Sequence, residues 1–280
     1  MLKEKIKNTP FIGRRLVSLY SSFLRFKDKK FLKKNRELEN KFAGKRAFVI
    51  ATGPSIKMED LKPLAGEFSI SVSNFFVHPD FKTIKPAFHI FAPSHPPITS
   101  EQCAKLFADA EKHFPEGQNV FISTTDRHIV EKYGVLKLAN VYYYAPGHKE
   151  LNLKGAIDFT KQIPAMQTSP HIAIYLALFL GVKEINLLGV DHDWILHIKE
   201  TRHFYDEKES VLTQNNYNEW EGHDLEVELR SYLSLWQKYK KIRSYASKNG
   251  VNIYNATPGS LLDVFPKKNL VECLKKSDNK

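Results

Sequence analysis

The chain has 280 residues, 42% of them apolar, which suits one large α/β domain or two small ones. Its two cysteines, Cys103 and Cys273, are far apart and lack metal-ligand spacing, which argues against a disulfide framework and favours a reducing, cytoplasmic compartment. Charges interrupt the N-terminal apolar residues, so no signal peptide is expected, and the longest nearly uncharged apolar stretch, Ile172–Val182, is too short to cross a bilayer.

The net charge of +11 is concentrated at the N-terminus. Residues 1–46 hold 15 Lys/Arg and 4 Asp/Glu, whereas the remaining residues hold 27 of each sign. Within residues 1–43, cations surround an apolar stripe at helical spacing, made of Ile12, Leu16, Leu19, Tyr20 and Phe23. This pattern predicts a basic amphipathic helix that binds an anionic membrane, here the inner face of the cytoplasmic membrane. The alternative is a helix packed on the domain with a solvated basic face, and no recognised module points to nucleic acid.

The first predicted strand, 47–51, leads directly into the turn Thr52-Gly53-Pro54-Ser55. Gly53 suits a tight turn, Pro54 suits the first position of a helix, and Ser55 adds a hydroxyl beside backbone donors. A helix N-terminus in this place favours phosphate. Neither the Walker A ending nor the dinucleotide fingerprint is present, and the alternative is a turn without a ligand.

The rest of the chain alternates strands with helices. Four helices are expected, over 56–64, 99–114 with Ser100 as N-cap, 168–181 and 224–248. The helix over 168–181 is apolar all round, which predicts burial between layers. Six further strands are expected, over 68–72, 88–91, 120–123, 141–144, 184–189 and 251–255. We therefore expect a Rossmann-like α/β domain over 44–266, with a lid-like segment at 194–222 and a frayed basic tail at 267–280.

Such an order predicts a mostly parallel sheet with helices on both faces. Ligands of these sheets bind beyond the carboxyl ends of the strands. That rule gathers five short polar segments at one edge, namely Thr52–Ser55, Ser73-Asn74, Ser94-His95, Thr168-Ser169 and Asp191–Asp193.

The order of these segments resembles that of the bacterial Campylobacter-type sialyltransferases and the wider group related to archaeal 6-hydroxymethylpterin pyrophosphokinases. The resemblance spans residues 46–265 and rests on Ala51–Ser55, Ser73-Asn74, Thr168-Ser169, Gly181–Ile185, Gly189–Asp191, Gly222-His223 and Pro258–Leu262. It implies a transferase that uses a CMP-activated acidic sugar, of the sialic acid or Kdo kind, without a required metal. A cell-surface glycan or glycolipid is the implied acceptor, in lipopolysaccharide or capsule biosynthesis.

The resemblance also implies roles for particular residues. His223 matches the general base, Asn74 a nucleotide-contacting asparagine and Ser169 a donor-site serine. Histidine suits the base because it titrates near neutral pH. The full set implied at the nucleotide-sugar pocket is Thr52, Gly53, Pro54, Ser55, Asn74, Thr168, Ser169, Asp191 and His192.

The chain departs from the family at two places. Thr52 stands where the family has asparagine. The two tyrosines that hold the leaving phosphate in the family are missing after Asp191, and His192, His203 or Tyr205 are the candidate substitutes.

Other interpretations of these residues stay open. Asp191 and Asp193 also fit an Asp-x-Asp magnesium site, either in a metal-dependent glycosyltransferase or in a pyrophosphokinase-like enzyme acting with ATP on a pterin-like alcohol. His192, His197 and His203 suggest a zinc site but lack regular ligand spacing. His223 is otherwise a surface cap of the helix that follows it. A Ser-His-Asp hydrolase is not expected, because no Gly-x-Ser-x-Gly elbow is present.

Overall fold

The computed structural model describes residues 28–197, 203–205 and 224–275. Within them, seven strands form one sheet in the order β5-β4-β3-β2-β1-β6-β7, and every neighbouring pair is parallel. The strands are β1 Arg46–Ile50, β2 Ser69–Val72, β3 Phe88–Ile90, β4 Asn119–Ser123, β5 Asn140–Tyr144, β6 Glu184–Leu188 and β7 Asn252–Asn255. The predicted α/β class and parallel sheet are confirmed.

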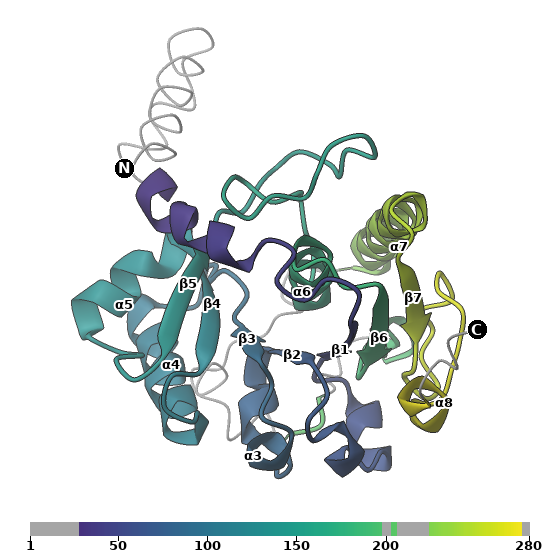
Figure 1. Cartoon of the computed structure of the whole chain (residues 1–280), viewed down its shortest axis with the longest axis horizontal. Coiled ribbons are helices and arrows are strands. Elements are labelled where there is room, and N and C mark those ends of the chain that lie inside the picture. The colour runs from purple at the N-terminus through teal and green to yellow at the C-terminus, as the bar shows by residue number, and fades with distance from the viewer. Residues whose placement is uncertain (1–27, 198–202, 206–223, 276–280) are drawn as a thin grey trace, which may run out of the picture.

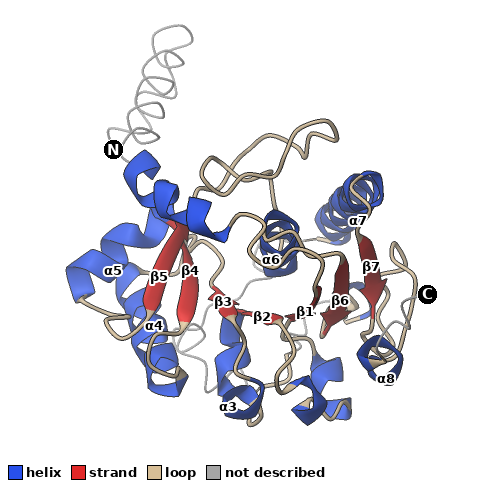
Figure 2. Ribbon diagram, viewed as in Figure 1, coloured by secondary structure: helices blue, strands red, loops and turns tan. Residues whose placement is uncertain are grey.

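Helices cover both faces of this sheet (Figures 1 and 2). One face carries α6 and α7, and the other carries α3, α4 and α8. The described α-helices are α3 Phe81–Ile84, α4 Ser100–His113, α5 Arg127–Tyr133, α6 Ser169–Phe179, α7 Leu225–Lys248 and α8 Leu270–Leu274. The described 3-10 helices are η1 Lys33–Leu38, η2 Pro54–Met58, η3 Lys62–Leu64, η4 Ser73–Val77, η5 Thr124–Asp126 and η6 Trp194–Leu196.

The strand order reverses between β1 and β6. From β1 the chain proceeds outward strand by strand to β5, then returns through α6 to place β6 against the other side of β1. In open parallel sheets, the carboxyl ends of the two strands at such a switch point leave a crevice where ligands bind. The topology therefore singles out the loops after β1 and β6.

Two apolar cores lie on the two faces of the sheet, as the alternation of side chains along a strand requires. Ala47 and Val49 of β1 pack in the core that contains α6, whereas Phe48 and Ile50 pack in the core that contains α4. Nine of the eleven residues of α6 are buried. The predicted burial of this helix between layers is confirmed.

Some local expectations were wrong. The segment 56–64 forms two short 3-10 helices in place of one helix, and Pro63 lies at the start of the second, where it cannot donate a hydrogen bond to a preceding turn. The N-cap of α4 is Thr99 and not Ser100. The Thr99 hydroxyl accepts from the Gln102 N–H at 3.2 Å, and the Gln102 side chain accepts from the Thr99 N–H at 2.9 Å, which makes a capping box.

The chain after Pro266 was expected to be frayed, but residues up to 275 are folded. Leu270 and Cys273 of α8 are buried under the sheet. The guanidinium of Arg46 donates to three carbonyls at the end of α8, and it also pairs with Glu67. A cation at these carbonyls complements the helix dipole, so this arginine joins α8 to the start of β1.

Part of the segment expected to form the N-terminal extension packs on the sheet. In η1, Leu38 is buried, and the Asn35 amide donates to the carbonyls of Tyr143 and Phe159, both at 2.7 Å. Tyr143 belongs to β5, so η1 covers an edge strand of the sheet.

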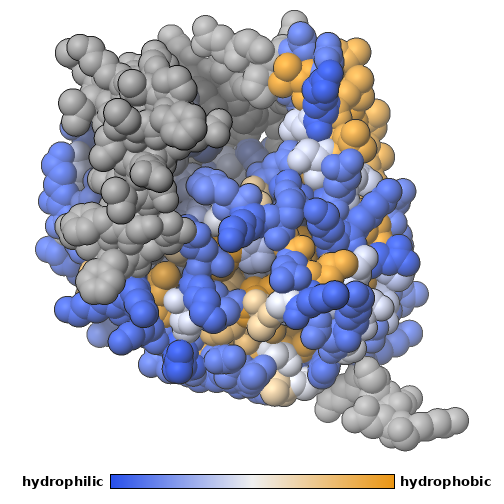
Figure 3. Space-filling view, turned by 90° about the horizontal axis from the view of Figure 1, so that it is seen from above, coloured by the Kyte–Doolittle hydropathy of each residue, from blue (hydrophilic) through white to orange (hydrophobic). Residues whose placement is uncertain are grey.

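The predicted amphipathic helix at residues 12–23 and most of the lid-like segment lie outside the described residues. No helix within the described ranges is long and apolar enough to span a membrane. On the face that carries α6 and α7, hydrophobic surface gathers toward one margin (Figure 3). Exposed leucines are present in the N-terminal half of α7, at Leu225, Leu229 and Leu233.

Candidate functional site

The loops after β1 and β6 are joined directly at the switch point. The N–H of Ser55 donates to one oxygen of Asp191 at 3.0 Å, and the Ser55 hydroxyl donates to the other at 2.8 Å. The Gly53 N–H also donates to the Gly189 carbonyl at 2.9 Å. Asp191 thus places its carboxylate at the N-terminus of η2, the position where the sequence predicted a ligand phosphate.

Gly53 is needed for a different reason from the one expected. Its φ of −63° is open to any residue, so it does not provide a turn that only glycine can adopt. A Cβ there would lie 1.8 Å from Asp191 Oδ2 and 2.6 Å from the Gly189 carbonyl oxygen. Gly189 itself has a φ of +66° and would place a Cβ 2.7 Å from the Ala51 carbonyl oxygen. The two loops approach each other so closely that each needs a glycine at the contact.

The carboxyl end of β2 meets the N-terminus of α6. Ser73 Oγ lies 3.1 Å from Ser169 Oγ, and Ser73 holds a left-handed φ of +54°. Asn74 follows, with only 6% of its surface exposed. Thr168 is the N-cap residue of α6 but makes no side-chain capping bond there. Two segments far apart in the sequence are therefore brought together as the edge rule predicted.

His203 and Tyr205 lie beside the first turn. His203 Nδ1 is 3.4 Å from both the hydroxyl and the carbonyl oxygen of Thr52, and the Phe204 N–H donates to that carbonyl at 3.1 Å. The rings of His203 and Tyr205 stack, with centroids 4.9 Å apart. Burial lowers the pKa of His203, so its ring is neutral near pH 7. Two of the three expected substitutes for the phosphate-binding tyrosines thus lie at the predicted donor turn, His203 directly and Tyr205 through its stack on His203.

His192 has a different environment, although it directly follows Asp191. Its Nε2 lies 2.7 Å from the hydroxyl of Tyr239, and the Tyr232 hydroxyl donates to its backbone carbonyl. Its φ of +48° is left-handed, and burial lowers its pKa to about 3. The ring is therefore neutral and turned toward α7. Sequence reasoning missed both tyrosines, although their spacing of seven residues puts them on one face of the helix.

A second serine–aspartate pair joins the loops after β3 and β4. The Ser94 N–H and hydroxyl donate to the two oxygens of Asp126, the N–H at 2.8 Å. Ser94 was among the predicted edge residues, whereas Asp126 was missed. The only signal for Asp126 was its place just after a strand. The pattern repeats the Ser55–Asp191 pair and ties another two loops of the same edge together.

The structure also bears on the alternative sites. Among residues 28–197, 203–205 and 224–275, no group of three or more His, Cys, Asp or Glu side chains is arranged to hold a metal ion. Both oxygens of Asp191, a candidate ligand together with Asp193, bind Ser55. His223 lies outside the described residues. The N-cap of α7 is Asp224, whose side chain accepts from the Val227 N–H at 2.9 Å.

No protein-family model matches the chain, and no curated protein sequence matches it. Among solved structures, it is similar to the sialyltransferase CstII from Campylobacter jejuni in complex with the substrate analogue cytidine-5'-monophosphate. That match has a TM-score of 0.47 and 15% identity, and it covers 80% of this chain and 85% of the other. A sialyltransferase CST-II complex with a trisaccharide acceptor and CMP matches with a TM-score of 0.44 and 16% identity, over 80% of this chain and 85% of the other. At these identities the likeness concerns the fold alone.

Proposed function

We propose that this chain is a glycosyltransferase that moves an acidic sugar of the sialic acid or Kdo kind from its CMP donor to a cell-surface glycan or glycolipid. One observation carries the proposal: motifs that follow the sialyltransferase order in the sequence meet at a single edge of the sheet. Ser73 reaches Ser169, Ser55 reaches Asp191, and Thr52 reaches His203 there.

The donor is proposed to lie over the carboxyl edge of the sheet, beside the loops after β1 and β2 and the N-terminus of α6. Thr52 and Asn74 are the candidate contacts for the nucleotide, and the N-terminus of α6 at Ser169 adds backbone donors. His203 and Tyr205 are the candidate donors to the phosphate as it leaves. In the tautomer where Nδ1 of His203 accepts from the Thr52 hydroxyl, the one N–H of the neutral imidazole is on Nε2 and is available to the phosphate. A phenol donates through its hydroxyl. Both stabilise the developing charge of the phosphate by hydrogen bonding.

His223 is proposed as the general base. The acceptor hydroxyl attacks the anomeric carbon, and its proton passes to the imidazole. The bond from that carbon to the phosphate oxygen breaks, and its electron pair stays on CMP. General-base assistance of this kind contributes about 10²–10⁴-fold in rate.

Ligand-dependent unfolding tests the donor. We expect CMP to raise the Tm by about 5 °C at a concentration 100 times its Kd, with or without magnesium, because binding to the folded state alone contributes about 2.7 kcal/mol. UDP, GDP and CDP serve as controls. Stabilisation by ATP that requires magnesium, with none by CMP, would overturn this proposal in favour of the pyrophosphokinase-like alternative.

Kinetics of a His223→Ala variant test the base. We expect kcat to fall by about 10²–10⁴-fold while CMP binding is kept. His128→Ala, a change of an exposed histidine on α5, is the matched control and should keep full activity. Activity of His223→Ala near that of the control would remove His223 from the mechanism.

Attachment to the inner face of the membrane is proposed for the basic N-terminal segment. Deleting residues 1–27 is the appropriate test, because η1 and the rest of 32–42 contribute buried residues to the domain. The truncated protein should no longer sediment with anionic liposomes, whereas the full chain should sediment with anionic but not with neutral liposomes. Equal sedimentation of both proteins would exclude this segment as the anchor.

A further inference from the structure

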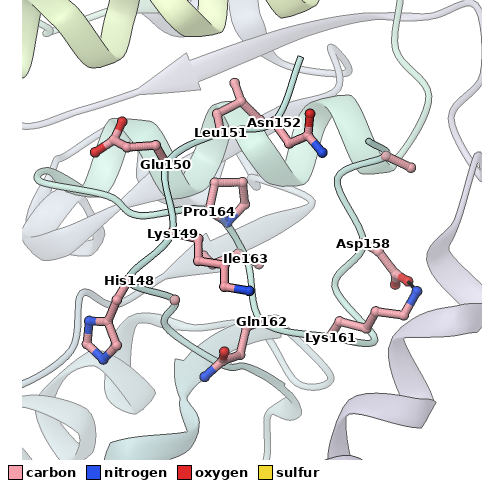
Figure 4. Close-up of a pocket in the computed structure, with 12 residues that line it drawn as sticks. His148, Lys149, Glu150, Leu151, Asn152, Asp158, Lys161, Gln162, Ile163 and Pro164 are labelled. Atoms are coloured by element: carbon pink, nitrogen blue, oxygen red, sulfur yellow. Dashed lines mark ion pairs between the residues drawn. The ribbon is translucent and has the colours of Figure 1, made fainter. Parts of the chain in front are cut away.

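The connection between β5 and α6 encloses a pocket of about 270 Å³ that takes no part in the site described above (Figure 4). Two backbone hydrogen bonds hold its walls together: Ile163 N–H donates to the Ala145 carbonyl at 3.0 Å, and Ala165 N–H donates to the Lys149 carbonyl at 2.7 Å. A Cβ on Gly147 would lie 2.1 Å from the Ile163 carbonyl oxygen, so the close approach of the walls needs glycine. These contacts fix the shape of the pocket within the connection between β5 and α6.

Both carboxylates of the lining are already neutralised. Glu150 pairs with Lys238 at 3.0 Å and with Lys241 at 3.2 Å, and the hydrogen bond from Lys238 lowers the pKa of Glu150. Asp158 pairs with Lys161 at 2.8 Å, as the dashed line in Figure 4 marks. Lys149 extends across the middle of the lining and makes no ion pair with any of the described residues. Within the part of the chain that the structure describes, Lys149 is therefore the lining cation without a carboxylate partner.

The other lining residues suit a sugar ring. Ala156 is exposed and Pro164 is half-buried, so these two residues provide a small apolar surface for the C–H face of a pyranose, while Leu151 and Ile163 lie buried beneath them. The lining also carries the exposed amides of Asn152 and Gln162. Asn152 Oδ1 accepts from the Lys154 N–H at 2.9 Å, so the Asn152 NH2 group is the one that can bond a hydroxyl. Apolar walls with a few polar groups are the usual composition of a small-ligand site.

We propose that this pocket binds an acidic saccharide, with the carboxylate of the sugar paired to Lys149. Its assignment as the acceptor subsite rests on the proposed function. The place of the pocket agrees with that role. Pro164, on its wall, is five residues before Ser169, so the Cα atoms of these two residues are at most about 17 Å apart. An oligosaccharide is long enough to bridge such a span.

Binding of defined saccharides by NMR titration tests the proposal on the full chain. The probes are 3′-sialyllactose, neutral lactose and inorganic phosphate. We expect sialyllactose to bind at least tenfold more tightly than either of the others, with shifts confined to 147–164. Lys149→Ala should weaken sialyllactose binding about tenfold, and Lys149→Arg should largely keep it. Lys154→Ala, in the same connection but outside the lining, is the matched control.

Four results would overturn the proposal: no binding of sialyllactose, equal binding of lactose and sialyllactose, equal binding by Lys149→Ala and Lys154→Ala, or phosphate binding as tight as that of sialyllactose. CMP binding is measured on the same samples, so that failure of the saccharide site can be distinguished from failure of the proposed function. CMP binding without sialyllactose binding rejects the pocket alone. Sialyllactose binding without CMP binding keeps the saccharide site and rejects the transferase.

Discussion

A methyl group added at Gly53 should strain the contact on which the candidate site is built. The backbone of Gly53 has φ −63° and ψ 157°, which alanine adopts freely, so the whole effect of Gly53→Ala is steric. The added Cβ would overlap Asp191 Oδ2 at 1.8 Å and the Gly189 carbonyl oxygen at 2.6 Å. Relief requires the loops to separate, which breaks the two hydrogen bonds from Ser55 to Asp191.

The expected cost follows from these contacts. Hydrogen bonds to a charged group contribute about 1.5–3 kcal/mol each, and overpacking a well-filled site costs about 1–3 kcal/mol. We therefore expect Gly53→Ala to lower the free energy of unfolding by at least about 3 kcal/mol, which is the lower limit for losing both hydrogen bonds. Equilibrium unfolding in urea measures it, with an unchanged m-value as the sign that the transition is the same.

Gly66→Ala is the matched control. Gly66 has a φ of +85° but nothing within 4 Å of its Cβ position, so this change should cost only about 1–2 kcal/mol of left-handed strain. In an Asp191→Ala background, Gly53→Ala should cost less than in the wild type, because one of the two clashes is gone. A cost for Gly53→Ala below about 1 kcal/mol, or no larger than that for Gly66→Ala, would refute the steric reasoning.

Three further predictions concern residues of the domain that support the site, namely Arg46, His89 and Asp126. Arg46→Ala should release α8, seen as rapid proteolysis of the C-terminus, whereas Arg46→Lys should restore only part of the protection because an ammonium lacks the planar fork of arginine. His89 is fully buried among aromatic rings, and burial lowers its pKa to about 3. Unfolding therefore takes up a proton as pH falls below about 6.5, and stability should drop toward pH 3 by up to about 1.4 kcal/mol per pH unit for this residue. His89→Gln should reduce that slope in urea titrations at stepped pH, and an unchanged slope would contradict the assignment. Asp126→Ala should cost about 3 kcal/mol, because it leaves two donors of Ser94 without their acceptor, and a loss below about 1 kcal/mol would contradict that view.

The fold was predictable because its signals are local. Most strands have a short apolar run, and α6 has an apolar surface on all sides, so the fold class, the layers and the buried helix followed from the sequence pattern alone. The short helices were missed or misplaced because they are too short to carry such a local signal. A helix such as α8 has too few residues for a periodic pattern, and it is held by Arg46 from the other end of the chain.

The positions that make up the candidate site were predictable from the sequence. The contacts between their side chains were less predictable. The edge rule named Thr52, Ser73, Ser169 and Asp191, and the structure brings these loops together. The roles of individual groups within the set depend on distances between segments that are far apart in sequence. The binding of Asp191 to Ser55 and the turn of His192 toward α7 are such cases.

The sequence by itself therefore determined the parallel α/β architecture, the edge where polar loops collect and the separation of a basic N-terminus from a neutral body, because composition and periodicity encode these properties residue by residue. Only the tertiary structure decided which side chains at that edge contact one another. It set the carboxylate of Asp191 against the first turn, placed His203 beside Thr52 and built the pocket around Lys149. Those arrangements arise from the parallel pairing of β1 with β6 at the switch point and from the path of the connection to α6. Such long-range approaches leave no periodic pattern in the sequence.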